Sequence, residues 1–372
     1  MKHVFTLALV SLLAGTTVGA ETSAPLWLRH QQISPDGRSI AFCFQGDIYT
    51  VPTAGGSAQR ITSNAAYDGT PIWSPDSKRL AFSSDREGGK DVYIVSTDGS
   101  GMRRLTYNSA KEVPVVFLDN NTLLFQADIM PDASFGMYPW SWFVQTYSLD
   151  LTKDVARPRL YNSTPMATPS LRNGEILYTD IKGYEDIWRK HAISPVAKDI
   201  WHLSKEGKYT KLTTFGGEDR NAIWDDKGGF YYLSERDGSY NVYHRASVSP
   251  SASDERITTF SKNPVRFLSR AENGTLCFGY DGEIYTLTPG GKPQKVAITL
   301  VRDQEEASVK KQWLTSDISS FAVAPSDKEI AFVARGDVYV THTEYKTTKR
   351  ITDTPQQLSL IHISEPTRQA EI

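Results

Sequence analysis

Short apolar runs alternate with turn-forming residues along most of this chain. The turn sequence Ser-Pro-Asp-Gly at 34–37 precedes an apolar run at 39–42, and a second run follows at 47–51. The same order of turn, run and run recurs over 74–106. In such a turn proline presets φ, aspartate bonds its own backbone and glycine accepts a positive φ. The pattern therefore predicts pairs of short antiparallel strands joined by tight turns.

Two short motifs recur in phase along the chain and define seven units. A polar-aliphatic-aromatic triplet recurs every 42 to 54 residues and begins at Asp47, Asp91, Gln145, Asp199, Asn241, Glu283 and Asp337. A basic-aliphatic-Thr triplet begins at Arg60, Arg104, Lys211, Arg256 and Arg350, and degraded copies begin at Arg159 and Lys295. A period of about 40–50 residues with about four strands per period is typical of the blades of a β-propeller.

The predicted fold class is all-β: a β-propeller with six closed blades, followed by the first blade of a second propeller. One seven-bladed propeller and a β-sandwich with coincidental spacing are the alternatives. A small sheet cannot bury both faces alone, so blades must pack side by side. The predicted domains are a six-bladed propeller at 25–299, a linker at 300–312, a first blade of a second propeller at 313–357, and a non-native tail at 358–372. The tail departs from the blade pattern and looks like a translated sequencing adapter.

The N-terminus predicts secretion. A basic start, an apolar stretch over 4–14 and the small residues of 18–20 form a signal peptide at 1–20, too short to span a membrane. No other run approaches the ~20 apolar residues of a membrane helix, so a soluble periplasmic or extracellular protein with no membrane span is expected. The net charge of −2 gives no reason to expect nucleic acid. Cys43 and Cys277 fall on the same side of equivalent strands, which predicts two free, buried thiols and no disulfide.

Two long insertions interrupt the blades, at 128–140 and 180–191. The first is interpreted as a cap over one end of the ring or as a ligand-binding loop. The second is interpreted as a charged surface loop, or as a loop that binds a peptide terminus or docks another domain. The sequence predicts no catalytic residue, cofactor or metal, because Gly-x-Ser-x-Gly, His-Glu-x-x-His and Cys-x-x-Cys are all absent. The repeated acids begin equivalent strands in separate blades, which favours a structural role.

Several stretches resemble a known family. They are Trp188-Arg189-Lys190-His191, Asp199-Ile200-Trp201, Gly217-Glu218-Asp219-Arg220-Asn221, Tyr232-Leu233-Ser234-Glu235-Arg236 and Tyr280-Asp281-Gly282-Glu283-Ile284-Tyr285. Together with the Ser-Pro-Asp turns they resemble the N-terminal part of secreted bacterial tricorn protease homologues, over about residues 25–357. The candidate binding residues are Trp188, Arg189, Lys190, His191, Asp219 and Arg220.

The resemblance implies a serine peptidase with a six-bladed propeller, a seven-bladed propeller and a catalytic region with a PDZ-like module. It implies that the propellers channel peptides and that every catalytic element lies downstream of residue 372. The expected partners are peptides and the chain's own downstream domains. Association into a homo-oligomer is a further possibility. A stand-alone TolB-like periplasmic protein-binding propeller is the alternative. A propeller enzyme with its site at the central channel is a third reading.

Overall fold

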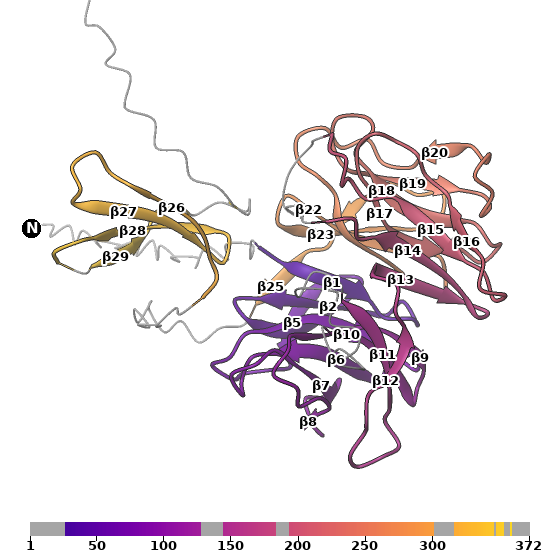
Figure 1. The fold of residues 1–372 in the computed structure, drawn as a ribbon, viewed down its shortest axis with the longest axis horizontal. Helices are drawn as coiled ribbons and strands as arrows, with labels where there is room; N and C mark the ends of the chain where they lie inside the picture. Colours follow the sequence, from indigo (N-terminus) through magenta and orange to yellow (C-terminus); the bar gives the residue numbers. More distant parts are fainter. Residues whose placement is uncertain are drawn as a thin grey trace, which may run out of the picture.

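The computed structural model describes residues 27–127, 144–183, 193–300, 316–345, 347–352 and 358. Within these ranges every regular element is a β-strand, so the prediction of an all-β chain is confirmed. The strands form seven sheets, here numbered 1 to 7 in chain order, of four consecutive strands each (Figure 1). Sheet 1 gains a fifth strand, β25, from much later in the chain.

The first three sheets comprise β1 to β12. Sheet 1 contains β1 (Arg29–Ile33), β2 (Ser39–Phe44), β3 (Asp47–Pro52), β4 (Gly56–Arg60) and β25 (Ile298–Leu300). Sheet 2 contains β5 (Asp68–Trp73), β6 (Arg79–Ser84), β7 (Asp91–Ser96) and β8 (Arg103–Arg104). Sheet 3 contains β9 (Glu112–Asp119), β10 (Thr122–Ala127), β11 (Gln145–Asp150) and β12 (Arg159–Asn162).

The other four sheets repeat this order. Sheet 4 contains β13 (Met166–Arg172), β14 (Glu175–Asp180), β15 (Ile200–Leu203) and β16 (Tyr209–Lys211). Sheet 5 contains β17 (Asp219–Trp224), β18 (Phe230–Ser234), β19 (Asn241–Arg245) and β20 (Asp254–Arg256). Sheet 6 contains β21 (Arg266–Arg270), β22 (Leu276–Tyr280), β23 (Glu283–Leu287) and β24 (Gln294–Lys295). Sheet 7 contains β26 (Ile318–Val323), β27 (Glu329–Ala334), β28 (Asp337–His342) and β29 (Thr348–Arg350).

The Ser-Pro-Asp turn joins the first two strands, as predicted. The Ser34 hydroxyl donates to Asp36 Oδ1 at 2.5 Å and accepts from the Ser39 amide at 3.0 Å. Gly37 follows with φ of 73°, a conformation that glycine adopts without strain. The turn therefore closes on its own polar groups and starts β2 in a fixed register.

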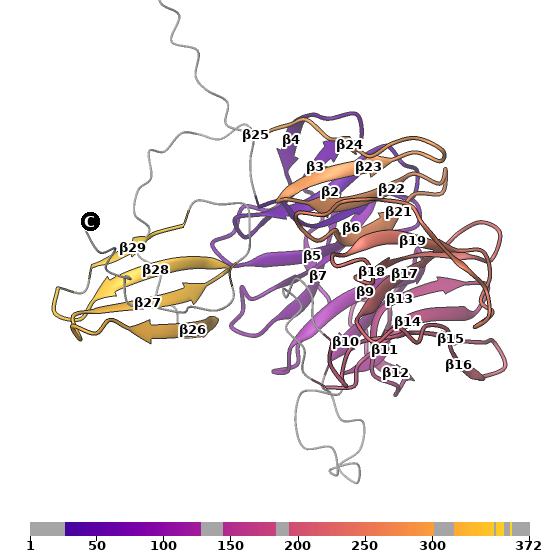
Figure 2. The ribbon, with the colours of Figure 1, turned by 90° about the horizontal axis from the view of Figure 1, so that it is seen from above.

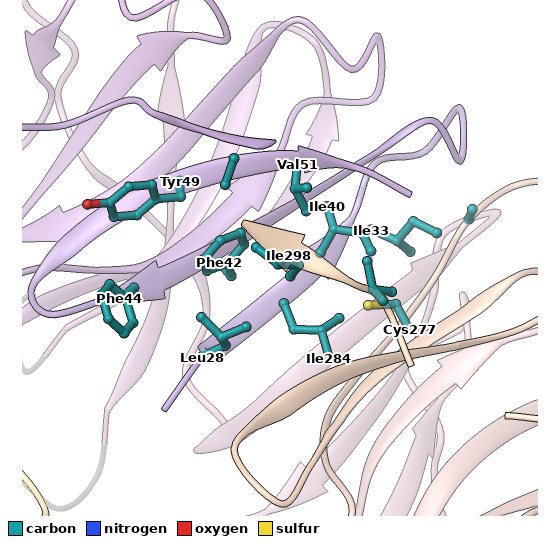
Figure 3. Packing of buried hydrophobic residues seen from close by; sticks show 13 residues of the cluster. Leu28, Ile33, Ile40, Phe42, Phe44, Tyr49, Val51, Cys277, Ile284 and Ile298 are labelled. Carbon is teal, nitrogen blue, oxygen red and sulfur yellow. The ribbon is translucent and has the colours of Figure 1, made fainter. Parts of the chain in front are cut away.

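Alternate residues of each strand pack against different neighbouring sheets. In β2, Ile40 and Phe42 join Cys277 and Ile284 of sheet 6 in one buried cluster (Figure 3). The intervening residues, such as Cys43, point the other way into a cluster shared with sheet 2. Similar clusters join sheets 2 and 3, sheets 4 and 5, and sheets 5 and 6. Both cysteines are buried and free, as predicted.

Hydrogen bonds between first strands accompany these clusters. The Ile33 amide of sheet 1 donates to Ser269 Oγ of sheet 6 at 3.1 Å. The Trp73 indole of sheet 2 donates to the Gln32 carbonyl of sheet 1 at 2.8 Å. Sheets 3 and 4 differ, because the apolar cluster on that side contains residues of sheet 4 alone. There the Gln126 side-chain amide donates to the Met166 carbonyl, a polar link where other sheets share an apolar core.

The strand β25 ties the end of the sixth unit to the first. It runs parallel to β4, with Ile298 opposite Gly56, and its Ile298 side chain enters the cluster between sheets 6 and 1. The neighbouring Gly55 has φ of 89°, and a Cβ there would lie 2.5 Å from the Ala297 carbonyl oxygen. Glycine is therefore required for the close approach of these two segments.

Sheet 7 lies beside the other six sheets in both views (Figure 1, Figure 2). It meets them where Arg29 Nη2 donates to the Arg335 carbonyl at 3.2 Å and where the Arg335 guanidinium lies 5.1 Å from the Tyr67 ring centre. Its apolar side chains are largely uncovered, and Phe321 is 68% exposed. None of the chain's described residues forms a helix long and apolar enough to cross a membrane.

Several predicted segments fall outside the described residues. These are the signal peptide at 1–20, residues 128–140 and 184–191 of the two insertions, residues 301–312 of the linker, and residues 359–372 of the tail.

Candidate functional site

In five of the seven sheets, an acid at or next to the start of the third strand pairs with a basic residue of the fourth. In sheet 2, Arg104 Nη2 donates to Asp91 Oδ2 at 2.9 Å, and Arg104 Nε donates to the Thr106 carbonyl at 2.9 Å. The Thr106 hydroxyl accepts from the Val92 amide at 2.8 Å. We call this arrangement of acid, basic residue and threonine the strand latch.

The ion pair or the threonine contact of the strand latch recurs in five further sheets. Ion pairs between the third and fourth strands link Asp47 to Arg60, Asp199 to Lys211, Glu283 to Lys295 and Asp337 to Arg350. The threonine hydroxyl accepts an amide in sheets 1, 4, 5 and 7, through Thr62, Thr213, Thr258 and Thr352. Because each acid is paired within its own sheet, these carboxylates stabilise the fold and do not converge on one site.

The candidate residue Asp219 begins β17 and is fully buried. Burial raises its pKa to about 6, although the nearby Arg236 guanidinium acts in the opposite direction. Arg236 Nη2 lies 3.3 Å from Asp219 Oδ2, and Arg236 Nη1 donates to Asp254 Oδ2 at 2.7 Å. Arg245 Nε donates to the same Asp254 carboxylate at 2.7 Å. The predicted residue is therefore part of a buried ion-pair network within sheet 5.

The candidate residue Arg220 has different neighbours. Its guanidinium lies over the Tyr240 ring, 4.3 Å from the ring centre, and 3.8 Å from Glu218 Oε1. The Tyr240 hydroxyl donates to Glu218 Oε2 at 2.5 Å, and Glu235 Oε1 accepts the Glu218 amide. Successive residues of a strand face opposite sides, so Asp219 and Arg220 enter separate groups of contacts. The other four candidates, Trp188, Arg189, Lys190 and His191, lie outside the described residues.

The histidines that the structure describes contact aromatic rings or carboxylates. His30 lies 4.7 Å from the Phe267 ring, and burial lowers its pKa to about 3. His244 Nε2 lies 2.8 Å from Asp225 Oδ2, and His202 Nε2 lies 3.6 Å from Glu175 Oε1. In the described part of the chain, no group of three His, Cys, Asp or Glu side chains is placed to hold a metal ion.

Sequence reasoning missed Glu112, the first residue of β9. Its side chain is fully buried, and it lies against Thr106, the Asn108 backbone and Asp91. Burial raises its pKa to about 7. The strand register places Glu112 opposite Ala127, as Asp68 is placed opposite Ser84 and Asp219 opposite Ser234. Only alignment of the three first strands would have marked this position in advance.

Comparison with known proteins agrees with this architecture. Residues 25–293 match the family model described as the tricorn protease N-terminal beta propeller domain. Tricorn protease homolog 1 of Streptomyces coelicolor is 31% identical over 285 residues, 75% of this chain and 25% of the relative. The tricorn protease homolog of Saccharolobus solfataricus is 24% identical over 321 residues, 82% of this chain and 27% of the relative. This chain thus spans about a quarter of the length of both relatives.

Two solved structures share the fold. The crystal structure of the tricorn protease gives a TM-score of 0.62 at 18% identity, covering 88% of this chain and 31% of the other. The crystal structure of TolB from Acinetobacter baumannii gives a TM-score of 0.53 at 16% identity, covering 72% of this chain and 66% of the other. At these identities the likeness shows the fold alone, and the fold is of the propeller type.

Proposed function

Because this chain belongs to the tricorn protease N-terminal propeller family, we propose that it is the peptide-channelling region of a secreted tricorn-like serine peptidase. The observation that carries the proposal is the family match over residues 25–293, which coincides with the six consecutive sheets. In this proposal the chain is not catalytic by itself, and the nucleophile and its partners lie in downstream domains.

We propose that sheets 1 to 6 close a ring around a channel that peptides enter. The packing of sheet 6 against sheet 1 supports this, because Cys277 and Ile284 share a buried cluster with Ile40 and Phe42. The parallel pairing of β25 with β4 supports it as well, since it fastens the end of the sixth unit to the first. Peptides that pass such a ring would be selected by size and by the charges that line it.

Sheet 7 fits the first blade of a second propeller. Its strands repeat the order of the other sheets, yet Phe321, Ile318 and Ile351 are more than 45% exposed, at 68%, 49% and 56%. A further sheet packed on this one would cover these side chains, as neighbouring sheets cover them elsewhere. The proposal includes secretion through the signal peptide at 1–20 and function in the periplasm or outside the cell.

Fluorescence anisotropy tests the proposal directly. The purified chain is titrated against labelled oligopeptides of six to twelve residues, and the peptides are then weighed by mass spectrometry. The expected result is saturable binding with every peptide intact. If no peptide binds at a millimolar concentration of the chain, peptide channelling is overturned. If the rigorously purified chain cleaves a peptide, the non-catalytic assignment is overturned.

The second candidate function is a stand-alone, TolB-like protein-binding propeller. The TolB structure favours it, because the shared fold covers 66% of that chain. The DNA downstream of codon 357 distinguishes the two functions. An open frame that continues into a serine-peptidase domain supports the first, and a stop codon near this position supports the second.

A further inference from the structure

Hydrogen bonds join the turns between the first and second strands of neighbouring sheets. Three backbone amides of these turns donate to the next turn: Glu272 to the Pro35 carbonyl at 2.9 Å, Asp36 to Ser77 Oγ at 3.1 Å and Asp76 to Asn120 Oδ1 at 3.0 Å. Two guanidinium groups continue the series, because Arg172 donates to the Asp226 carbonyl at 3.1 Å and Arg270 donates to the Asp226 carboxylate. The series therefore runs from sheet 4 through sheets 5, 6, 1 and 2 to sheet 3.

The turns of sheets 3 and 4 do not close this series. In sheet 3, Asn120 accepts from sheet 2, and in sheet 4, Arg172 reaches sheet 5. Both turns, at 119–122 and 172–175, belong to the described part of the chain, where no hydrogen bond joins one to the other. The Gln126 amide meets the Met166 carbonyl at the opposite end of these strands.

Polar side chains also mark the side of sheet 3 that faces sheet 4. The triplet at 145–147 has Thr146 where the other six triplets have Ile or Val. Tyr147 and Leu149 pack towards sheet 2, so strand alternation turns Thr146 and Ser148 towards sheet 4. Gln126 lies opposite Thr146 in the strand register. We call the boundary lined by Gln126, Thr146 and Ser148 the seam.

Separating the sheets costs less at the seam than at any other boundary of the ring. Each of the other five boundaries has a buried apolar cluster shared by both sheets, and separation would expose that cluster to water. The cluster of sheet 4 on this side contains no residue of sheet 3 among the described residues. The Thr146 hydroxyl is buried and has no hydrogen-bond partner in the described part of the chain, so water would satisfy it once the seam opens.

We propose that the ring parts at the seam and that a peptide enters the channel sideways between sheets 3 and 4. The proposal rests on the closed ring and the peptide channelling proposed above, and it adds the route of entry. A closed ring admits a chain only by a free end. A ring that parts at one side admits an internal stretch of an extended polypeptide, even where both ends of that polypeptide are blocked.

Thiol labelling measures the opening of the seam. Thr146→Cys places a thiol at the seam, and Val92→Cys places one at the same triplet position of sheet 2, inside the cluster shared with sheet 3. Both native residues are buried and similar in size to cysteine. In the native full chain, a thiol reagent followed by peptide mapping should modify position 146 at least tenfold faster than position 92. Global unfolding exposes both positions alike, so the difference reports local opening, and equal rates would overturn the seam.

A second pair of variants keeps this test available if one of the first two does not fold. Leu124→Cys and Ala81→Cys occupy equivalent positions of the second strands, and both native residues are fully buried. Faster labelling at position 124 supports the seam, and equal labelling overturns it.

A peptide blocked at both ends tests sideways entry. An unstructured peptide long enough to cross the ring is biotinylated at both ends and capped with streptavidin, so that it has no end to thread. The wild-type chain should bind the capped and uncapped peptides with affinities within tenfold of each other. Saturating capped peptide should slow the labelling of Thr146→Cys and leave that of Val92→Cys unchanged.

The outcomes separate the seam from the wider function. Binding of the uncapped peptide alone would overturn sideways entry and leave peptide channelling standing, whereas binding of neither peptide would overturn both. Binding of the capped peptide with no effect on labelling at position 146 would also overturn sideways entry, because the peptide then lies elsewhere.

Discussion

Replacing Thr213 by valine removes one contact of the strand latch in sheet 4. The Thr213 hydroxyl accepts the Ile200 amide at 2.9 Å and approaches Asp199 Oδ1 at 3.5 Å. Thr213 and Ile200 are both buried, so no water replaces the lost acceptor. Valine keeps the shape of the side chain, and the variant therefore isolates the hydrogen bond.

A buried amide left without a partner costs about 1–3 kcal/mol. For domains of roughly 150–250 residues, each kcal/mol lowers the melting temperature by about 2–4 °C. Thr213→Val should therefore melt about 2–12 °C below the wild type. The pair with Asp199 is long and adds little to this loss.

Thr214 is the matched control, because it is adjacent in sequence and exposed. Thr214→Val should change stability by less than about 0.5 kcal/mol, as exposed substitutions usually do. Thermal melts of the three proteins, followed by far-ultraviolet circular dichroism at one scan rate, measure both effects. If both variants have the melting temperature of the wild type, the strand latch does not stabilise the sheets.

Three further predictions follow from burial and exposure. Burial raises the pKa of Cys43 and of Cys277 to about 12, so a thiol reagent at pH 8 should label neither in the native chain and both in guanidinium chloride; rapid native labelling would contradict this. Burial raises the pKa of Glu112 to about 7, above the ~4.3 of a glutamate in an unfolded chain. The folded state therefore holds this proton more tightly, and the free energy of unfolding should fall as the pH rises from about 4 to about 7. The melting temperature of Glu112→Gln should lack this slope, and parallel pH profiles would disprove the assignment. Replacing Phe321 and Val323 of sheet 7 by serine should reduce the concentration-dependent association seen in light scattering. Both side chains are exposed, so the other sheets should keep their stability. Unchanged association would show that this face of sheet 7 does not mediate self-association.

The sequence predicted what local pattern controls. The Ser-Pro-Asp turns, the strand ranges and the free cysteines all depend on residues close in the chain, and the structure confirms them. Strand alternation is equally local, and it places Asp219 and Arg220 in different contacts although they are neighbours in sequence. Their role as binding residues stays a prediction.

The sequence did not predict contacts between segments that lie far apart in the chain. The parallel pairing of β25 with β4 joins Ile298 to Gly56, and nothing in either short segment indicates its partner. The burial of Glu112 depends on a neighbouring sheet that contributes Asp91 and Thr106. Such features follow from packing across sheets, which a pattern within one unit does not specify.

The packing of sheet 6 against sheet 1 is the central claim, and hydrogen exchange at residue 33 tests it most directly. The Ile33 amide donates across the boundary to Ser269 Oγ at 3.1 Å. A hydrogen bond of about 0.5–1.5 kcal/mol corresponds to roughly twofold to tenfold in exchange rate, so Ser269→Ala should accelerate exchange at Ile33 by that factor. The Ile48 amide, which donates to Thr62 within sheet 1, should be unaffected. An Ile33 amide that exchanges equally fast in both proteins would mean that the two sheets do not meet as described.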